Sequence, residues 1–360
     1  MKHTLPARQR SLRDHNLGLA LRLVSDAPEP LSRAGIAALS GLTRATASTL
    51  VDELLSAGLV QEEALAPTSR SGRPATGIAL AAGGLGGIGL EINVDYLAAT
   101  VVDLTGAVVH EQVVEADQRG RPPVGVLRSA SRLAATTAKA SRLRLAGLAV
   151  ALPGLVTDGQ LLLAPNLGWT DVDLRGPIRT FLPVTFDNEA NFAALAEISP
   201  DLRSFVHVSG EIGIGGAIVV DGQLFRGTRG WSGEIGHVTV VADGPLCRCG
   251  ARGCLEVYAG RDALASPEGL RRAGKALGTV LSGALNVLDV STVVLGGTFA
   301  EHASTLLPAV QEQLAARVIW ARLEAPDVVV ARHGPAAAVL GAARSVVHTV
   351  LSEPQHWLVT

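Results

Sequence analysis

A short segment of the chain gathers the residues best suited to bind a metal. All three cysteines, Cys247, Cys249 and Cys254, lie within eight residues, and His237 precedes the first of them by ten. Three thiolates and one imidazole make a complete tetrahedral ligand set for zinc, and the glycines between them let the backbone curl tightly. Because four protein ligands leave no open position, we expect a structural Zn²⁺ site. Three incidental buried thiols are the alternative, and such close spacing counts against it.

The composition narrows the class of protein. The 360 residues are 48% hydrophobic and carry a formal net charge of −2, which excludes a chain that is basic along its whole length. Residues 1–75 nevertheless hold two more basic than acidic residues, whereas the remainder holds four more acidic than basic ones. An odd number of clustered cysteines is a poor disulfide framework, and no uninterrupted apolar stretch is long enough to span a membrane. We therefore expect a cytoplasmic protein with no membrane partner.

The beginning of the chain shows the hydrophobic spacing of three helices. We expect helices over 16–24, 32–41 and 44–57, with Ser32 and Thr43 as the N-cap residues of the second and third. Two short helices joined by a tight turn are typical of a helix-turn-helix, the motif that places its last helix in the major groove of DNA.

The third of these helices would carry the DNA contacts. Its outward N-terminal residues are Arg44, Thr46 and Ser48, of which arginine can bond guanine in two places and the hydroxyls can bond bases or phosphates. A β wing would begin at 59–61. An ordinary three-helix bundle has the same periodicity, and the pattern alone leaves both readings open.

A linker composition follows the helices. Residues 64–87 are rich in small residues, proline and glycine, and they contain Arg73 within the run Ser-Gly-Arg-Pro at 71–74. An extended arginine beside glycine and proline fits a narrow minor groove, although a plain linker accounts for the run equally well. We assign 1–65 to a winged helix-turn-helix domain and 66–85 to a linker or wing.

After the linker, strand-like and helix-like segments alternate. The expected strands are 86–103 with a continuation at 108–109, then 146–152, 183–187, 204–220, 292–295 and 327–331. The expected helices are 123–143, 189–198, 270–288 and 336–351. This alternation predicts an α/β fold of two similar halves with a ligand between them. Gly84, Gly86 and Gly89 match the dinucleotide pattern G-x-G-x-x-G, but they precede a strand instead of following one, so we reject that function.

Several motifs together resemble one family of proteins. The segment 233–237 reads Gly-Glu-Ile-Gly-His, and the cysteine run ends in Cys254-Leu255-Glu256, as in the signature of the ROK family of repressors, open reading frames and kinases. Further matching segments are Leu-Pro-Gly at 152–154, Ala-Pro-Asn-Leu-Gly-Trp at 164–169, Asp-Asn-Glu-Ala-Asn at 187–191 and Gly-Gly at 296–297. The resemblance covers essentially the whole chain, including the Ser-Gly-Arg-Pro run, and the pattern is most similar to that of xylose-type repressors.

The resemblance implies a fold and a ligand. The fold would be an actin-like (ribonuclease H-like), two-lobed sugar-kinase fold over 86–360, with lobes at about 86–190 plus the C-terminal helix and at about 191–335. A monosaccharide such as xylose, glucose or an N-acetylhexosamine would lie between the lobes. The residues implied to hold it are Gly154, Asn166, Asn188, Glu189, Glu234, His237 and Glu256. Carboxylates suit this role because they accept paired hydrogen bonds from neighbouring hydroxyls.

The kinase motifs of the family are altered in this chain. The first strand of the family's kinases reads Asp-x-Gly-Gly-Thr, whereas residues 91–95 read Glu-Ile-Asn-Val-Asp. Their second phosphate loop reads Gly-Thr-Gly, whereas residues 211–213 read Glu-Ile-Gly, and Glu189 stands where the kinases have the aspartate that acts as general base. A displacement of about 1 Å at such a position can cost about 100-fold in rate. We therefore expect no catalytic residue and no kinase activity.

The expected function is that of a sugar-responsive transcriptional repressor. A homodimer or homotetramer would bind double-stranded operator DNA through half-sites about 34 Å apart, and the family resemblance implies that sugar releases the DNA. Two rival functions stay open: an ATP-dependent sugar kinase of the hexokinase or glucokinase type with a DNA-binding appendage, and a metal-stabilised scaffold that binds neither sugar nor DNA.

Overall fold

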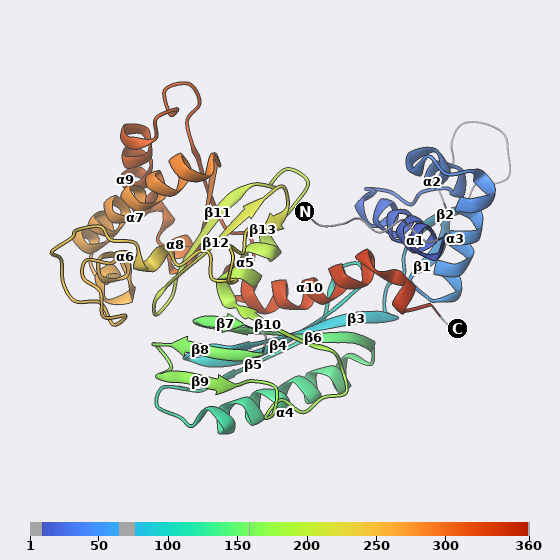
Figure 1. The fold of residues 1–360 in the computed structure, drawn as a ribbon, viewed down its shortest axis with the longest axis horizontal. Helices are drawn as coiled ribbons and strands as arrows, with labels where there is room; N and C mark the ends of the chain where they lie inside the picture. Colours follow the sequence, from blue (N-terminus) through green and yellow to red (C-terminus); the bar gives the residue numbers. More distant parts are fainter. Residues whose placement is uncertain (1–8, 65–75, 158, 359–360) are drawn as a thin grey trace.

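The N-terminal part of the molecule is a winged helix. The computed structural model describes residues 9–64, 76–157 and 159–358 (Figure 1). Helices α1 (Gln9–Asp26), α2 (Arg33–Ser40) and α3 (Arg44–Ser56) are followed by the antiparallel pair β1 (Val60–Ala64) and β2 (Thr76–Leu80). The first helix is longer than predicted. The Ser32 and Thr43 hydroxyls accept hydrogen bonds from the amides of Gly35 and Thr46, so both predicted N-caps are confirmed.

One part of the predicted linker is folded. Thr76–Leu80 forms β2, whose residues pair with β1, and Ile78 bridges back to Leu31. The small residues at 76–80 concealed this strand because they resemble the linker around them. Arg73 and the rest of 65–75 lie outside the described residues.

The first lobe is built on a five-stranded sheet of order β10-β6-β3-β4-β5. Its strands are β3 (Leu85–Ile92), β4 (Tyr96–Asp103), β5 (Val108–Glu115), β6 (Arg144–Leu152) and β10 (Val184–Asn188). Helix α4 (Pro123–Ser141) covers one face and α10 (Ala337–Ser352) the other (Figure 1). The segment 86–103, predicted as one strand, is two antiparallel strands joined by a turn at 93–95.

The glycines of the rejected dinucleotide pattern have a packing role. A Cβ atom on Gly89 would lie 2.1 Å from the carbonyl oxygen of Val339, and one on Gly86 would lie 2.2 Å from that of Val102. Neighbouring Gly87 faces α10 in the same way, since its Cβ would lie 2.6 Å from the carbonyl oxygen of Ala343. Gly87 and Gly89 let α10 lie directly on β3, and Gly86 lets β4 approach closely, so two of the three glycines of the pattern have a packing role that needs no nucleotide.

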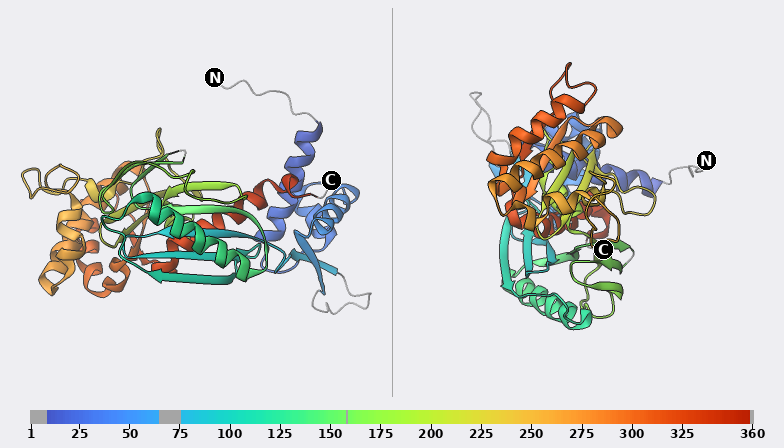
Figure 2. Two further views of the ribbon diagram at one scale, coloured as in Figure 1. Left: turned by 90° about the horizontal axis from the view of Figure 1, so that it is seen from below. Right: turned by 90° about the vertical axis from the view of Figure 1, so that its left-hand side faces the viewer.

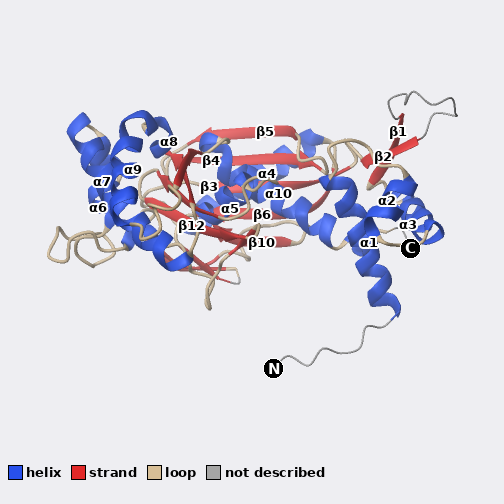
Figure 3. Ribbon diagram, turned by 90° about the horizontal axis from the view of Figure 1, so that it is seen from above, coloured by secondary structure: helices blue, strands red, loops and turns tan. Residues whose placement is uncertain are grey.

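The second lobe repeats the arrangement with a sheet of order β13-β12-β11-β14-β15. Its strands are β11 (Phe205–Gly210), β12 (Ile214–Val220), β13 (Gln223–Leu224), β14 (Thr292–Gly297) and β15 (Asp327–Val330). Helix α5 (Glu189–Glu197) covers one face, and α7 (Pro267–Leu288), backed by α9 (Ala303–Arg317), covers the other. The shorter helices α6 (Leu255–Ala259) and α8 (Thr298–Glu301) complete this lobe, which lies at the end of the molecule opposite the winged helix (Figures 2 and 3). The repeated order confirms the predicted actin-like plan.

A small sheet and a long helix were also missed at the sequence level. A small sheet of β7 (Leu155–Thr157), β8 (Gln160–Ala164) and β9 (Trp169–Asp173) inserts after β6, and α9 precedes β15. The three strands are short, and β9 is mostly polar and exposed, so hydrophobic alternation gives little signal there. In α9, Pro308 interrupts the helical pattern.

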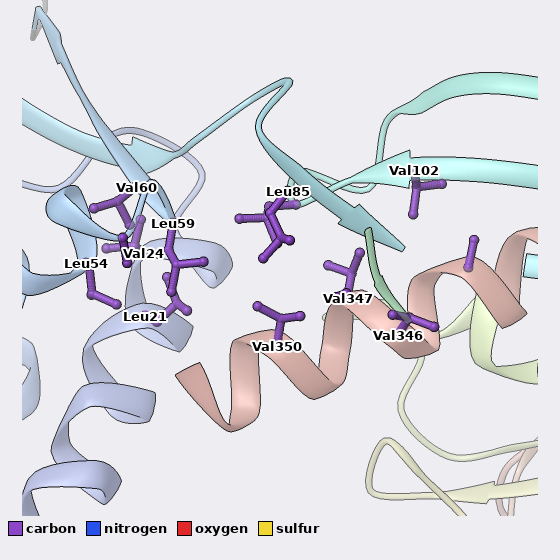
Figure 4. Packing of buried hydrophobic residues seen from close by; sticks show 14 of the residues in the cluster. Leu21, Val24, Leu54, Leu59, Val60, Leu85, Val102, Val346, Val347 and Val350 are labelled. Atoms are coloured by element: carbon purple, nitrogen blue, oxygen red, sulfur yellow. The ribbon is translucent and has the colours of Figure 1, made fainter. Parts of the chain in front are cut away.

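A continuous core joins the winged helix to the first lobe. Leu21 and Leu59 of the winged helix belong to the same buried cluster as Leu85 at the start of β3 and Val347 and Val350 of α10 (Figure 4). The segment Gly334–Ser352 is the one helix among the described residues that is long and apolar enough to cross a membrane, and 56% of the tested window is buried inside the protein. Its contacts are those of a core helix.

Candidate functional site

The four predicted metal ligands meet at one point. The ligand atoms of His237, Cys247, Cys249 and Cys254 all lie within 4.8 Å of one another. The Sγ atoms of Cys249 and Cys254 are 3.7 Å apart, close to the ~3.8 Å that a tetrahedron with Zn–S bonds of about 2.3 Å requires. Burial raises the pKa of the Cys254 thiol to about 12, so a bound cation is needed to hold all three sulfurs as thiolates. The cluster can therefore bind a metal ion.

The metal cluster is built into the segment that carries two acidic residues. Backbone bonds join Val240 N to Gly253 O at 2.7 Å and Leu255 N to Val238 O at 2.9 Å, so the stretch after Glu234 lies against the start of α6. Cys254 is the N-cap residue of α6, and Glu256 is the second residue of that helix. A metal held by residues 237 and 254 would therefore fix the positions of both glutamates.

His237 was predicted both as a metal ligand and as a sugar ligand, and the two roles would use different nitrogens of its ring. Nδ1 lies 3.9 Å from Cys247 Sγ, and Nε2 lies 4.0 Å from a carboxylate oxygen of Glu234. A metal ion at the cluster would take Nδ1 and leave Nε2 to the cavity beside Glu234, so one histidine can serve both sites.

A cavity of about 310 Å³ lies between the lobes. All seven residues predicted to hold a sugar line it: Gly154, Asn166, Asn188, Glu189, Glu234, His237 and Glu256. They come from the β6–β7 and β8–β9 connections, the start of α5, the segment before the metal cluster, and α6. The cavity is large enough for a monosaccharide, and polar groups from both lobes line it. A ligand in the cavity can therefore contact both lobes at once.

Two of these residues also shape the backbone around the cavity. Asn188 caps α5 by accepting a hydrogen bond from Ala190 N at 2.8 Å, and its Nδ2 donates to Gly154 O at 3.0 Å. Gly154 has φ +102°, and a Cβ there would lie 2.2 Å from Leu163 O. Asn188 thus positions the loop and retains one free N–H for a ligand.

Several residues of the cavity wall were not predicted as sugar ligands. Glu211, Asn93 and Trp231 line the cavity beside the predicted set. Glu211 follows β11, and its Oε2 accepts a 2.7 Å hydrogen bond from Asn93 Nδ2 across the two lobes. The altered phosphate motifs at 91–95 and 211–213 pointed to the first two residues, whereas nothing in the sequence distinguished Trp231.

Behind the large cavity, three glutamates surround a much smaller one of about 20 Å³. Glu91 from β3, Glu189 from the start of α5 and Glu211 all line it, and the last two also line the large cavity. Burial and the charge of Glu211 raise the pKa of Glu91 to about 8, and burial with the charges of Glu211 and Glu91 raises that of Glu189. Burial likewise raises the pKa of Glu211. We call Glu91, Glu189 and Glu211 the acidic cluster.

Further polar contacts cross between the lobes at the rim of the cleft. Arg261 donates to Asp95 at 3.1 Å, and Arg119 approaches the same carboxylate at 2.8 Å from its own lobe. On the other side, Arg226 lies 2.7 Å from Asp187. The pairs on Asp95 are exposed and individually weak, whereas Asp187 is buried, and the contacts show that the lobes touch each other in this structure.

The predicted DNA-contacting residues lie on the outer face of α3. Arg44 and Thr46 are exposed and Ser48 is half-buried, while the Thr46 hydroxyl also lies 2.9 Å from that of Thr43. Arg33 joins α2 to α3 through Asp52 at 2.5 Å, which fixes the angle of the helix pair. Arg73, the fourth predicted residue, lies outside the described part of the chain.

Two family profiles match separate parts of the chain. The ROK family profile matches residues 87–269, and that of the IclR helix-turn-helix domain matches residues 19–64. A xylose repressor of Bacillus subtilis (strain 168) is 27% identical over 322 residues, which cover 80% of this chain and 84% of that protein.

Two solved structures extend the comparison. A ROK family transcriptional regulator, a homologue of the E. coli MLC protein, has a TM-score of 0.79 at 24% identity and covers 95% of this chain and 97% of its own. A ROK hexokinase from Thermus thermophilus has a TM-score of 0.60 at 28% identity, over 75% of this chain and 98% of its own.

Proposed function

Because this chain belongs to the ROK family and carries a winged helix before its two lobes, we propose that it is a sugar-responsive DNA-binding repressor. The observation that carries the proposal is the path of α10. One end of this helix borders the small cavity through Ala337 and Ala338, and the other end packs on α1 of the winged helix. A change at the cleft can therefore reach the DNA-binding helices through one rigid element.

Contacts at the two ends of α10 connect the cleft between the lobes with the winged helix. At its beginning, Ala337 and Ala338 line the small cavity together with Glu91. At its end, Val350 lies in the core shared with the winged helix, and a Cβ on Gly18 of α1 would lie 2.9 Å from Ser352 O. In the proposed switch, a monosaccharide such as xylose, glucose or an N-acetylhexosamine binds between the lobes, shifts α10 and moves the two winged helices of a homodimer out of register with the operator.

We place the sugar against the seven predicted residues and a structural Zn²⁺ at His237, Cys247, Cys249 and Cys254. Glu234, Glu256 and His237 Nε2 offer acceptors from the metal-bearing side, and Asn166 and Asn188 offer amides from the first lobe. Bound zinc would hold the cluster closed and supply no reaction step, because all four positions are protein ligands.

The direct test is binding of DNA with and without sugar. We expect the protein to select a two-fold symmetric site from a random DNA pool and to release it when one sugar of a panel is added. Selection of no sequence, or a site whose affinity no sugar alters, would contradict the repressor function.

A first prediction concerns the recognition helix. Replacing Arg44 with alanine should weaken binding to the selected site by about 1–3 kcal/mol, since an exposed arginine at this place reads a base. Arg128→Ala removes an equal charge from an exposed site on α4 and is the matched control. Fluorescence anisotropy at fixed salt measures both. Equal affinities for Arg44→Ala and wild type would remove Arg44 from the interface.

A second prediction concerns the kinase rival. We expect no sugar-dependent ATP hydrolysis or sugar phosphate in a coupled assay with xylose, glucose and Mg-ATP, with an active glucokinase as positive control. In place of a phosphate-binding loop, the acidic cluster surrounds a space of about 20 Å³, which is too small for a polyphosphate. Turnover clearly above that of a no-enzyme control would show that the protein is a sugar kinase.

A further inference from the structure

The outer face of the first lobe is basic. Residues 118–157 contain seven arginine or lysine residues and no aspartate or glutamate, in a chain whose formal net charge is −2. Helix α4 lies in this segment and packs on β3, β4 and β5, on the opposite side of the sheet from α10 (Figure 1). It contributes no residue to the lining of the cavity between the lobes. The positive charge of α4 therefore belongs to a different surface.

Three arginines of this face line one groove. Arg128 and Arg132 lie one turn apart on α4, and Arg179 reaches the groove from the loop after β9. The groove has a volume of about 460 Å³, and none of its described lining residues carries a carboxylate. The Ser131 hydroxyl lies 3.1 Å from the backbone nitrogen of Arg179 and 3.3 Å from its carbonyl oxygen. These two bonds hold the loop against the helix, so the backbone on both sides of the groove is fixed.

The guanidinium groups in the groove have no acidic partner. Those of Arg128 and Arg179 make no hydrogen bond or ion pair with any residue in the described parts of the chain, and that of Arg132 donates to the Ser129 hydroxyl at 2.9 Å. Like charges around one groove repel one another. An anion that binds there relieves this repulsion and accepts charge-assisted hydrogen bonds from several arginines at once.

The charge of the groove indicates the class of anion. A phosphoryl group on an ester carries about −1.5 to −2 near pH 7 and offers three acceptor oxygens, which guanidinium groups bind in pairs. One carboxylate or one phosphoryl group leaves part of the charge of three arginines uncompensated, whereas two phosphoryl groups supply about −3 to −4. We propose that the groove between α4 and residues 177–179 is a second ligand site, which binds a small molecule with two phosphoryl groups.

The shape of the groove agrees with a compact ligand. Its volume of about 460 Å³ lies within the range of small-molecule sites. The arginines approach it from two sides, the helix and the loop, and so surround a short anion instead of following an extended one. A DNA strand, whose phosphates form a continuous line, matches this arrangement less well.

Calorimetric titration of the full-length protein tests the proposed ligand class. The probes are fructose 1,6-bisphosphate, inorganic phosphate and citrate, at neutral pH and low salt. We expect the bisphosphate to bind at least about 10-fold more tightly than the other two, because it alone supplies two phosphoryl groups. Absence of binding by the bisphosphate, or binding of citrate with equal affinity, would overturn the proposal.

Variants locate the site. Exchange of both Arg132 and Arg179 for alanine should weaken binding of the bisphosphate by at least about 10-fold. The matched control replaces Arg271 and Arg272, both exposed on α7, and should keep the wild-type affinity. Glu234→Gln, in the cavity between the lobes, should keep it as well.

Three results would overturn the assignment. Wild-type affinity in the Arg132 and Arg179 double variant would remove the groove as the site. Loss of binding in Glu234→Gln would place the bisphosphate between the lobes. Displacement of the bisphosphate by a random-sequence DNA duplex would make the groove a contact for nucleic acid.

Discussion

Exchange of Cys254 for serine is expected to remove the bound zinc, lower the melting temperature by several degrees and weaken sugar binding by about 10–100-fold. Cys254 is buried, supplies one of four ligands and begins α6, so its loss affects both the metal and the helix that carries Glu256. Zinc content by mass spectrometry, thermal unfolding and calorimetric titration with the effector would measure the three effects.

The expected pattern separates the metal's role in the sugar site from its role in overall folding. DNA binding without sugar should persist in Cys254→Ser, because the winged helix packs on α10 and β3, far along the chain from the cysteines. Wild-type protein treated with a chelator should lose sugar binding in the same way and recover it when Zn²⁺ is returned, whereas the variant should not recover. Full sugar affinity in the metal-free protein would show that the cluster does not position Glu234 and Glu256.

Sequence patterns predicted the His/Cys cluster that the structure brings together, but they missed some of the strands around it. The cysteine spacing and the Gly-Glu-Ile-Gly-His motif fixed a local geometry, since residues 237–254 form one compact loop whose ligands come from neighbouring positions. Strands such as β2 and β9 depend instead on partners distant in the sequence, and their own residues give no alternating pattern. A few neighbouring residues are enough to indicate a metal cluster, whereas the pairing of strands depends on residues far apart in the sequence.

The contacts of α10 could not be predicted from its sequence either. Its apolar sequence predicted a buried helix, but the pattern did not reveal that one end would meet Glu91 and the other the winged helix. The convergence of Glu91, Glu189 and Glu211 was indicated only by the altered kinase motifs, because they lie in three segments and a single carboxylate is ordinarily a surface charge. In the structure these three carboxyl groups are buried or half-buried, which distinguishes them from surface charges.

That burial leads to a prediction about pH: stability should fall between pH 6.5 and 8.5. Glu91 is 1% exposed, and its pKa is raised to about 8, so the folded protein holds a proton that the unfolded chain has already released. The unfolded state binds fewer protons over this interval, and the free energy of unfolding therefore decreases as pH rises. Glu91 alone would contribute up to about 1.4 kcal/mol per pH unit, and Glu189 and Glu211, whose pKa values are raised in the same direction, add to the decrease. Urea unfolding at a series of pH values measures it.

The chosen interval avoids groups that act in the opposite sense. Burial lowers the pKa of His207 to about 4, and it lowers those of His333 and His348, so these residues raise stability with pH only below about 6.5, where the unfolded chain takes up protons. Glu91→Gln should flatten the profile above that value, since the amide keeps an acceptor for the Tyr96 hydroxyl and cannot ionise. Glu115→Gln, on the exposed face of β5, is the control and should retain the wild-type slope. If both variants keep that slope, the proton whose release lowers the stability is not held by Glu91.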